Sequence, residues 1–89
     1  MAQYDNLFVP IKVGGITIPN RIVRTPHATL TLGDDLIAYH EARARGGVGM
    51  STLEATGVHP SAPGLLPLWS DECIPFFEKL TSTIKPYGM

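Results

Sequence analysis

Apolar and polar residues alternate along the first part of the chain, as they do in short strands. The stretch IKVGGITI (11–18) has two alternating arms on either side of Gly14 and Gly15, and paired glycines supply the positive φ angles of a two-residue hairpin turn. RIVRT (21–25) follows as a second run, rich in β-branched side chains and ended by Pro26. We therefore expect a β-hairpin over 11–18 and a strand over 21–25.

The pattern then changes to that of a helix followed by another strand. Asp34 or Asp35 can act as the N-cap of an Ala-, Leu- and Arg-rich helix over 35–45, which the glycine pair at 46–47 ends. The next run, VGMSTLEA (48–55), is mostly apolar and predicts a buried strand. Strand, helix and strand in this order indicate a βαβ unit, whose strands are parallel with a right-handed crossover.

The last third of the chain combines a turn-rich segment with a second helix. Residues 57–69 contain three prolines and two glycines, a composition that predicts a long loop. Ser70 is the expected cap of a helix over 71–85, and Pro86 and Gly88 are expected to end it. The side chains expected to face a core are Ile74, Phe76, Phe77, Leu80 and Ile84. Two parallel strands covered on one side leave both sheet edges unpaired, so we expect this α/β pattern to be part of a larger structure.

Composition and charge narrow the classes of partner. The chain has 89 residues and a formal net charge of −1, and its seven Lys and Arg residues are spread singly. Neither nucleic acid nor a membrane is therefore expected as a partner, and no stretch approaches the roughly 18 apolar residues of a spanning helix. The single cysteine, Cys73, cannot form an internal disulfide, which fits a cytoplasmic location.

The three histidines are candidates for acid–base chemistry, but each has a simpler interpretation. His27 follows the end of a strand, where a packed or hydrogen-bonded imidazole is more common than a catalytic one. His40 lies between Tyr39 and Glu41 in the predicted helix, which favours a solvated surface position. His59, in the predicted loop, is placed where it can reach a substrate, although loop histidines are mostly solvated. No two histidines have the spacing of metal ligands.

Two further side chains have alternative interpretations. Glu54 ends the second predicted strand and is either a general base or, more commonly at such a position, the partner of an arginine or of a helix N-terminus. Cys73 lies near a helix N-terminus, which can lower the pKa of a thiol and make it reactive. Without a second cysteine or a paired histidine, packing is the simpler account of Cys73.

Three ordered motifs carry a resemblance to a known family. LFVPIKVGGITIPNRIVRTPHAT, LIAYHEARARGGVGMSTLEATGVHPSA and LPLWSDECIPFFEKL together span Leu7 to Leu80. In this order they resemble the N-terminal part of the old yellow enzyme superfamily. Its members are NADH:flavin oxidoreductases and other NAD(P)H-dependent flavoproteins, and they include the 2,4-dienoyl-CoA reductases and the trimethylamine dehydrogenases. The TPH sequence is more similar to the amine-dehydrogenase and dienoyl-CoA-reductase branch than to the yellow enzymes themselves.

The resemblance implies a fold and a cofactor site. The fold is an α/β (β/α)8 TIM barrel, of which residues 1–89 form the capping hairpin and the first two βα units. FMN lies at the C-terminal mouth of such a barrel. Thr25, Pro26, His27, Ala28 and Ala55 match the residues that form one wall of the flavin site, where backbone N–H groups near Ala28 can bond the polar edge of the ring. Several relatives carry a hydroxyl or a thiol at Ala28, so side-chain contact with the flavin is lost there.

The resemblance also implies an activity, which is hydride transfer between NAD(P)H, flavin and a small organic substrate such as an activated alkene or an amine. The catalytic acid and the phosphate-binding residues of the family, and any iron–sulfur cluster of a longer protein, have no counterpart before Met89. An alternative is therefore a non-catalytic truncated fragment or assembly piece that folds or acts only with additional chain, for which a homo-oligomer and a complementing chain are the candidate partners. We expect residues 1–89 alone to bind FMN weakly and to be inactive.

Overall fold

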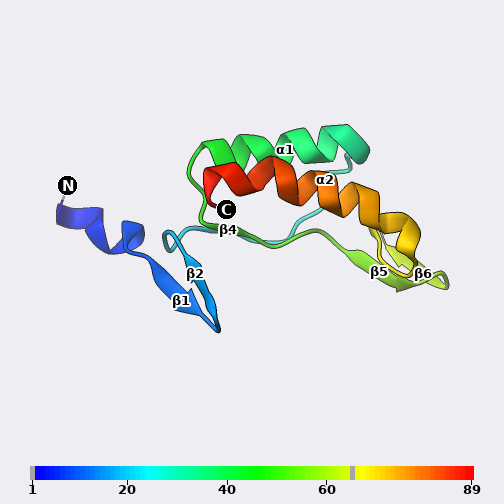
Figure 1. Ribbon diagram of the computed structural model, residues 1–89, viewed down its shortest axis with the longest axis horizontal. Helices are drawn as coiled ribbons and strands as arrows, with labels where there is room; N and C mark the ends of the chain where they lie inside the picture. The colour runs from blue at the N-terminus through cyan, green and yellow to red at the C-terminus, as the bar shows by residue number, and fades with distance from the viewer. Residues whose placement is uncertain (1, 65) are drawn as a thin grey trace.

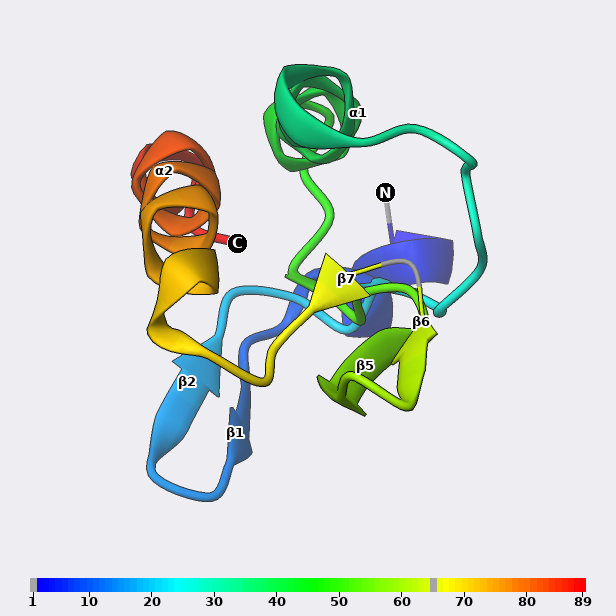
Figure 2. The same cartoon turned by 90° about the vertical axis from the view of Figure 1, so that its right-hand side faces the viewer.

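The computed structural model describes residues 2–64 and 66–89, which form an elongated α/β arrangement of 49 × 26 × 21 Å. Its radius of gyration is 14.6 Å, whereas a compact domain of this length has about 12 Å. The two longest helices lie side by side above extended segments, with a hairpin at one end and a small sheet at the other (Figure 1). The end-on view separates these parts into an upper helical layer and a lower layer of strands (Figure 2).

The predicted hairpin over 11–18 is present. Strands β1 (Ile11–Val13) and β2 (Ile16–Ile18) are antiparallel, and Gly14 in the turn has φ +60°. A 3-10 helix, η1 (Ala2–Phe8), precedes them and was not expected from the alternation. The hairpin projects away from the helices (Figure 1), and its strand residues are exposed except for the half-buried Ile18.

The βαβ unit is present, but its strands are shorter than expected. Strand β3 (Val23–Arg24) pairs in parallel with β4 (Met50–Ser51), and helix α1 (Gly33–Arg45) connects them. The strands predicted over 21–25 and 48–55 therefore contribute two paired residues each. Beyond β3 and β4, the backbone carbonyls of His27 and Thr52 accept hydrogen bonds from the buried side chain of Arg24.

The predicted N-cap of α1 is wrong. The helix begins at Gly33, Leu32 occupies the cap position, and no side chain bonds the first turn. Asp34 and Asp35 lie in that first turn, where carboxylates still interact favourably with the helix dipole. The carboxylate of Asp34 instead forms an ion pair with Lys79, with 2.8 Å between Oδ1 and Nζ. The predicted end of the helix is correct, since α1 ends at Arg45, Gly46 is its C-cap, and Gly47 follows with φ +101°.

The long loop predicted over 57–69 is also wrong, because part of it forms a small sheet. Strand β5 (Thr56–His59) pairs antiparallel with β6 (Ala62–Gly64) and parallel with β7 (Leu66–Pro67). Glycine makes the pairing possible: a Cβ on Gly57 would lie 2.0 Å from the carbonyl oxygen of Pro63. The glycines that suggested a loop therefore permit close contact between strands.

The second helical segment has three parts. A 3-10 turn, η2 (Asp71–Cys73), leads into α2 (Ile74–Ile84), and a second turn, η3 (Lys85–Tyr87), follows. Ser70 precedes η2 without a capping side-chain bond, so its predicted role as a cap is wrong. The α-helix ends before Pro86, which lacks the N–H that would continue it, and Gly88 leaves η3 with φ +92°.

The core lies between the helices and the strands. The buried apolar residues among those described are Leu36, Ile37, Ala44, Leu66 and Leu80. Of the side chains expected to face a core from α2, Leu80 alone is fully buried, Phe76, Phe77 and Ile84 are half-buried, and Ile74 is 52% exposed. Many other large apolar side chains are exposed, among them Phe8, Ile16, Leu30, Leu32 and Val58. In the described part of the chain, no helix is both long and apolar enough to cross a membrane.

Candidate functional site

The residues predicted to face a flavin follow the ends of β3 and β4. Residues 25–28 continue from β3 as an exposed, irregular segment, and Ala55 lies exposed between β4 and β5. The parallel pairing brings the carboxyl ends of β3 and β4 to the same edge of the sheet. A backbone hydrogen bond of 3.0 Å from Thr52 N–H to the carbonyl oxygen of Arg24 continues that alignment beyond β4.

One backbone carbonyl of the 25–28 segment is hydrogen-bonded to a buried side chain. Arg24 Nη2 donates a hydrogen bond of 3.0 Å to the carbonyl oxygen of His27. Within the described residues, the N–H of Ala28 donates to no protein acceptor. This exposed donor is therefore available to a ligand that lies against the segment.

The imidazole of His27 lies against helix α1. Its Nε2 is 3.2 Å from the hydroxyl of Tyr39, and the two rings meet edge to face at 6.3 Å between centroids. The guanidinium of Arg43 stacks on the ring of Tyr39, with its carbon 3.6 Å from the ring centroid. This geometry agrees with the packed, hydrogen-bonded interpretation of His27.

A buried cluster of charged and polar side chains lies beneath the two exposed segments. Arg24, His40 and Glu54 are 9%, 1% and 4% exposed. Arg24 Nη1 is 3.5 Å from Glu54 Oε1, and His40 Nε2 is 3.3 Å from the same oxygen. The expected pairing of Glu54 with an arginine is therefore confirmed. The predicted solvated position of His40 is wrong, because helix α1 turns this side chain inward toward the strand ends.

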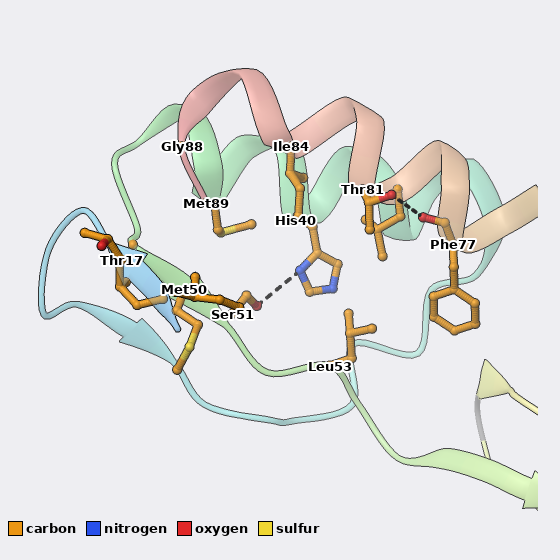
Figure 3. Close-up of a pocket in the computed structure, with 14 residues that line it drawn as sticks. Thr17, His40, Met50, Ser51, Leu53, Phe77, Thr81, Ile84, Gly88 and Met89 are labelled. Carbon is orange, nitrogen blue, oxygen red and sulfur yellow. Dashed lines mark hydrogen bonds between the residues drawn. The ribbon is translucent and has the colours of Figure 1, made fainter. Parts of the chain in front are cut away.

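Two hydroxyl groups complete the buried cluster. Thr29 Oγ1 donates to Glu54 Oε2 at 3.0 Å, and Ser51 Oγ lies 3.4 Å from His40 Nδ1. Figure 3 shows the His40 ring projecting toward Ser51 below the helices. The cluster thus joins α1, the end of β4 and the segments that follow both strands.

Burial and hydrogen bonding set the charge states of the cluster. Burial lowers the pKa of His40 below its usual value, and this effect outweighs the hydrogen bond to Glu54, which raises the pKa. Burial alone would raise the pKa of the Glu54 carboxyl, but hydrogen bonds from Thr29 and His40 and the charge of Arg24 lower the pKa below its usual value. At neutral pH the cluster therefore contains a carboxylate, a guanidinium and a neutral imidazole. A neutral His40 that donates from Nε2 to Glu54 accepts at Nδ1 from Ser51.

Two other candidate residues lie away from this site. His59 is exposed in β5, where its Nδ1 is 2.8 Å from Ser61 Oγ. Cys73 is a half-buried free thiol at the end of η2. The described contacts connect neither residue with the buried cluster.

An apolar cavity of about 320 Å³ opens beneath α2, and His40 and Ser51 of the buried cluster lie on its wall. Phe77 and Ile84 line it from the helix, and Met50 and Leu53 line it from the β4 side (Figure 3). Leu80 of α2 is a further lining residue. Among the described residues β4 pairs with β3 alone, and both residues of β4, Met50 and Ser51, line this cavity. The cavity is a place where additional polypeptide can pack.

Comparison with known proteins decides the family. The model of the NADH:flavin oxidoreductase / NADH oxidase family matches residues 6–89. The chain belongs to this family. It is 37% identical to the NADH oxidase of Thermoanaerobacter brockii over 98 residues, a match that covers 99% of this chain and 15% of that protein. The resemblance to the old yellow enzyme superfamily is thereby confirmed.

Solved structures of the family share the fold. The 6-hydroxypseudooxynicotine amine oxidase of Pseudomonas geniculata N1 superimposes with a TM-score of 0.87 at 33% identity, over 99% of this chain and 14% of that chain. The Old Yellow Enzyme of Pichia sp. AKU4542 superimposes with a TM-score of 0.73 at 27% identity, over 93% of this chain and 24% of that chain. The chain therefore has the mixed α/β fold of these flavoproteins over a quarter or less of their length.

Sequence reasoning missed most of the buried cluster. The pattern gave no sign that Arg24, Thr29 or Ser51 contacts a charged partner, and it placed His40 at the surface. The one useful signal was Glu54, an acid at the end of a predicted strand, for which an arginine partner was expected.

Proposed function

We propose that the chain contributes one wall of the FMN site in an NAD(P)H:flavin oxidoreductase built on a (β/α)8 barrel. In this proposal the β1–β2 hairpin closes the bottom of the barrel, β3 and β4 are its first two strands, and α1 and α2 are its first two outer helices. The observation that carries the proposal is the parallel pairing of β3 with β4, which places residues 25–28 and Ala55 at the same end of the sheet.

The exposed residues suit a flat aromatic cofactor. Ala28 and Ala55 present only methyl groups, so a planar ring can approach the backbone closely. Pro26 fixes φ and has no N–H that needs a partner. The exposed N–H of Ala28 can donate to a carbonyl or ring nitrogen at the polar edge of a flavin. The side chain of His27 turns toward Tyr39 and leaves this surface clear.

In the proposed enzyme, bound FMN supplies hydride exchange between NAD(P)H and a small organic substrate such as an activated alkene or an amine. The residues described here position the ring and stabilise negative charge at its polar edge. An amine substrate is supported by the similarity to the amine oxidase, and an activated alkene by the resemblance of the sequence motifs to the 2,4-dienoyl-CoA reductase branch of the superfamily.

The test is an FMN titration of the protein expressed from its complete reading frame, followed by flavin fluorescence. We expect stoichiometric binding, and reduction of the bound flavin by NADH or NADPH. Ala55→Phe should weaken FMN binding by roughly tenfold or more, because the ring and the phenyl group compete for the same space. The matched control is Ala38→Phe, at an exposed position of α1. A wild-type protein that binds no FMN, or an Ala55→Phe variant that binds it as tightly as Ala38→Phe, would contradict the proposal.

A second proposal concerns how the chain is completed. The apolar cavity beneath α2 and the free edge of β4 favour contact with further polypeptide, either more of the same chain, a second copy or a complementing chain. Sedimentation of the purified protein distinguishes a monomer from an assembly. A solvent-protected amide at Ser51 would show that the β4 edge is covered, whereas the Met50 N–H already donates to the carbonyl oxygen of Ile22 at 3.3 Å on the β3 side.

A further inference from the structure

We propose that Arg24 is a positioning residue that aims the backbone N–H of Ala28 at the flavin. This inference rests on the proposed FMN site. The residue lies one position before the exposed segment, yet its side chain is buried and reaches forward to the carbonyl oxygen of His27 at 3.0 Å.

Because the peptide group is planar, the hydrogen bond to the His27 carbonyl also fixes the direction of the Ala28 N–H. In a trans peptide the carbonyl of one residue and the N–H of the next point in opposite directions. None of the peptide bonds in the described part of the chain is cis. Because the carbonyl of His27 points toward the buried guanidinium, the N–H of Ala28 points away from it, on the exposed side of the segment.

The guanidinium is itself held from several directions. Nη1 donates to the carbonyl oxygen of Thr52 at 2.8 Å, and Thr52 N–H donates back to the carbonyl oxygen of Arg24 at 3.0 Å. Glu54 lies 3.5 Å from Nη1 and balances the charge. The carboxylate is in turn fixed by Thr29 and His40. One arginine therefore ties together the two segments that form the proposed flavin wall.

The shape of arginine matters as well as its charge. The planar guanidinium bonds the His27 and Thr52 carbonyls at the same time through two different nitrogens. A lysine in this place keeps the positive charge, but its three donors lie on a single nitrogen at the end of a flexible stem, so it does not reproduce the two fixed nitrogens that bond the His27 and Thr52 carbonyls. Arg24→Lys therefore keeps the positive charge of the side chain while it removes the hydrogen-bonding geometry that orients the His27 carbonyl.

The experiment compares Arg24→Lys, the neutral double variant Arg24→Gln/Glu54→Gln and the control Arg45→Gln, all in the protein expressed from its complete reading frame. Arg45 is an exposed arginine of α1. Circular dichroism checks the fold, a fluorescence titration gives the FMN affinity, and the visible absorption spectrum reports hydrogen bonding to the bound flavin. We expect both Arg24 variants to fold and to bind FMN roughly tenfold more weakly, with shifted absorption bands, while the control matches the wild type.

The outcomes separate this inference from the proposed function. If the wild type and both Arg24 variants bind FMN with the same affinity and the same spectrum, the inference is wrong and the proposed function stands. If the variants lose thermal stability but keep the wild-type spectrum, Arg24 is structural and the inference is again wrong. A wild-type protein without FMN affinity overturns both. A weakened affinity with a shifted spectrum in Arg24→Lys, which retains the charge, supports the orienting role.

Discussion

Replacing Glu54 with glutamine should be among the most destabilising single changes in this chain. Glutamine keeps the size of the side chain but removes its charge, which leaves the buried guanidinium of Arg24 without a counter-ion. At the observed separation of 3.5 Å and an effective dielectric constant of about 20, the lost attraction is about 5 kcal/mol. Breaking one side of a buried ion pair costs about 3–5 kcal/mol in practice. A chain of this length has a total stability of about 4–13 kcal/mol.

Urea unfolding followed by far-ultraviolet circular dichroism measures this change. A loss of about 3 kcal/mol lowers the urea midpoint by at least about 1 M, since the denaturant dependence is about 1–3 kcal/mol per M. The matched control is Asp34→Asn, which breaks the ion pair with Lys79. That pair is shorter, at 2.8 Å, but its side chains are 82% and 59% exposed. Exposed pairs contribute about 0–1 kcal/mol.

The comparison tests whether burial or distance decides the strength of an ion pair. If distance decides, Asp34→Asn should be the more harmful change. If burial decides, Glu54→Gln should be several times more harmful. A Glu54→Gln variant whose urea midpoint matches that of Asp34→Asn would refute the argument that Arg24 depends on a buried counter-ion.

Two other predictions concern pH and backbone packing. The pKa of His40 is lowered in the folded state, so its contribution to stability is present above the unfolded value of about 6.5 and is lost as pH falls toward the folded value. The melting temperature should therefore fall between about pH 7 and pH 5, and less steeply in His40→Gln; equal slopes would contradict this. Gly57→Ala should cost about 1–3 kcal/mol or more in thermal unfolding, because the added methyl group meets the carbonyl of Pro63. Gly15→Ala, with open space around it, should change little, and equal losses at both sites would show that the close contact is unimportant.

The elements that were predicted correctly are those that depend on residues within the element or next to it. The hairpin depends on its own glycines, and the end of α1 depends on Gly47, whose φ of +101° glycine adopts readily. The β5–β7 sheet was missed for the opposite reason. Its glycines and prolines are typical of loops, and only the approach of Gly57 to Pro63 across the pairing shows why a glycine is required there.

The candidate site likewise contains residues that could be predicted from the sequence and residues that could not. The exposed segment at 25–28 and Ala55 follow predicted strands, so they could be named from the sequence, although their contact with a flavin stays a prediction. The burial of His40 could not be predicted from the sequence, because its partners Ser51 and Glu54 lie 11 and 14 residues further along the chain. Its neighbours in sequence, Tyr39 and Glu41, are polar and gave the wrong indication.

The wide sequence separation within the buried cluster has a consequence for synthesis. Arg24 and Thr52 are 28 residues apart, and at about 5–20 residues per second a ribosome adds Thr52 roughly 1–6 s after Arg24. During that interval Thr52 and Glu54, which fix the guanidinium in the folded structure, have not yet been added to the chain. A nascent chain that stops within helix α1 has therefore made every residue of the 25–28 segment but neither of the partners beyond β4 that hold Arg24 in place.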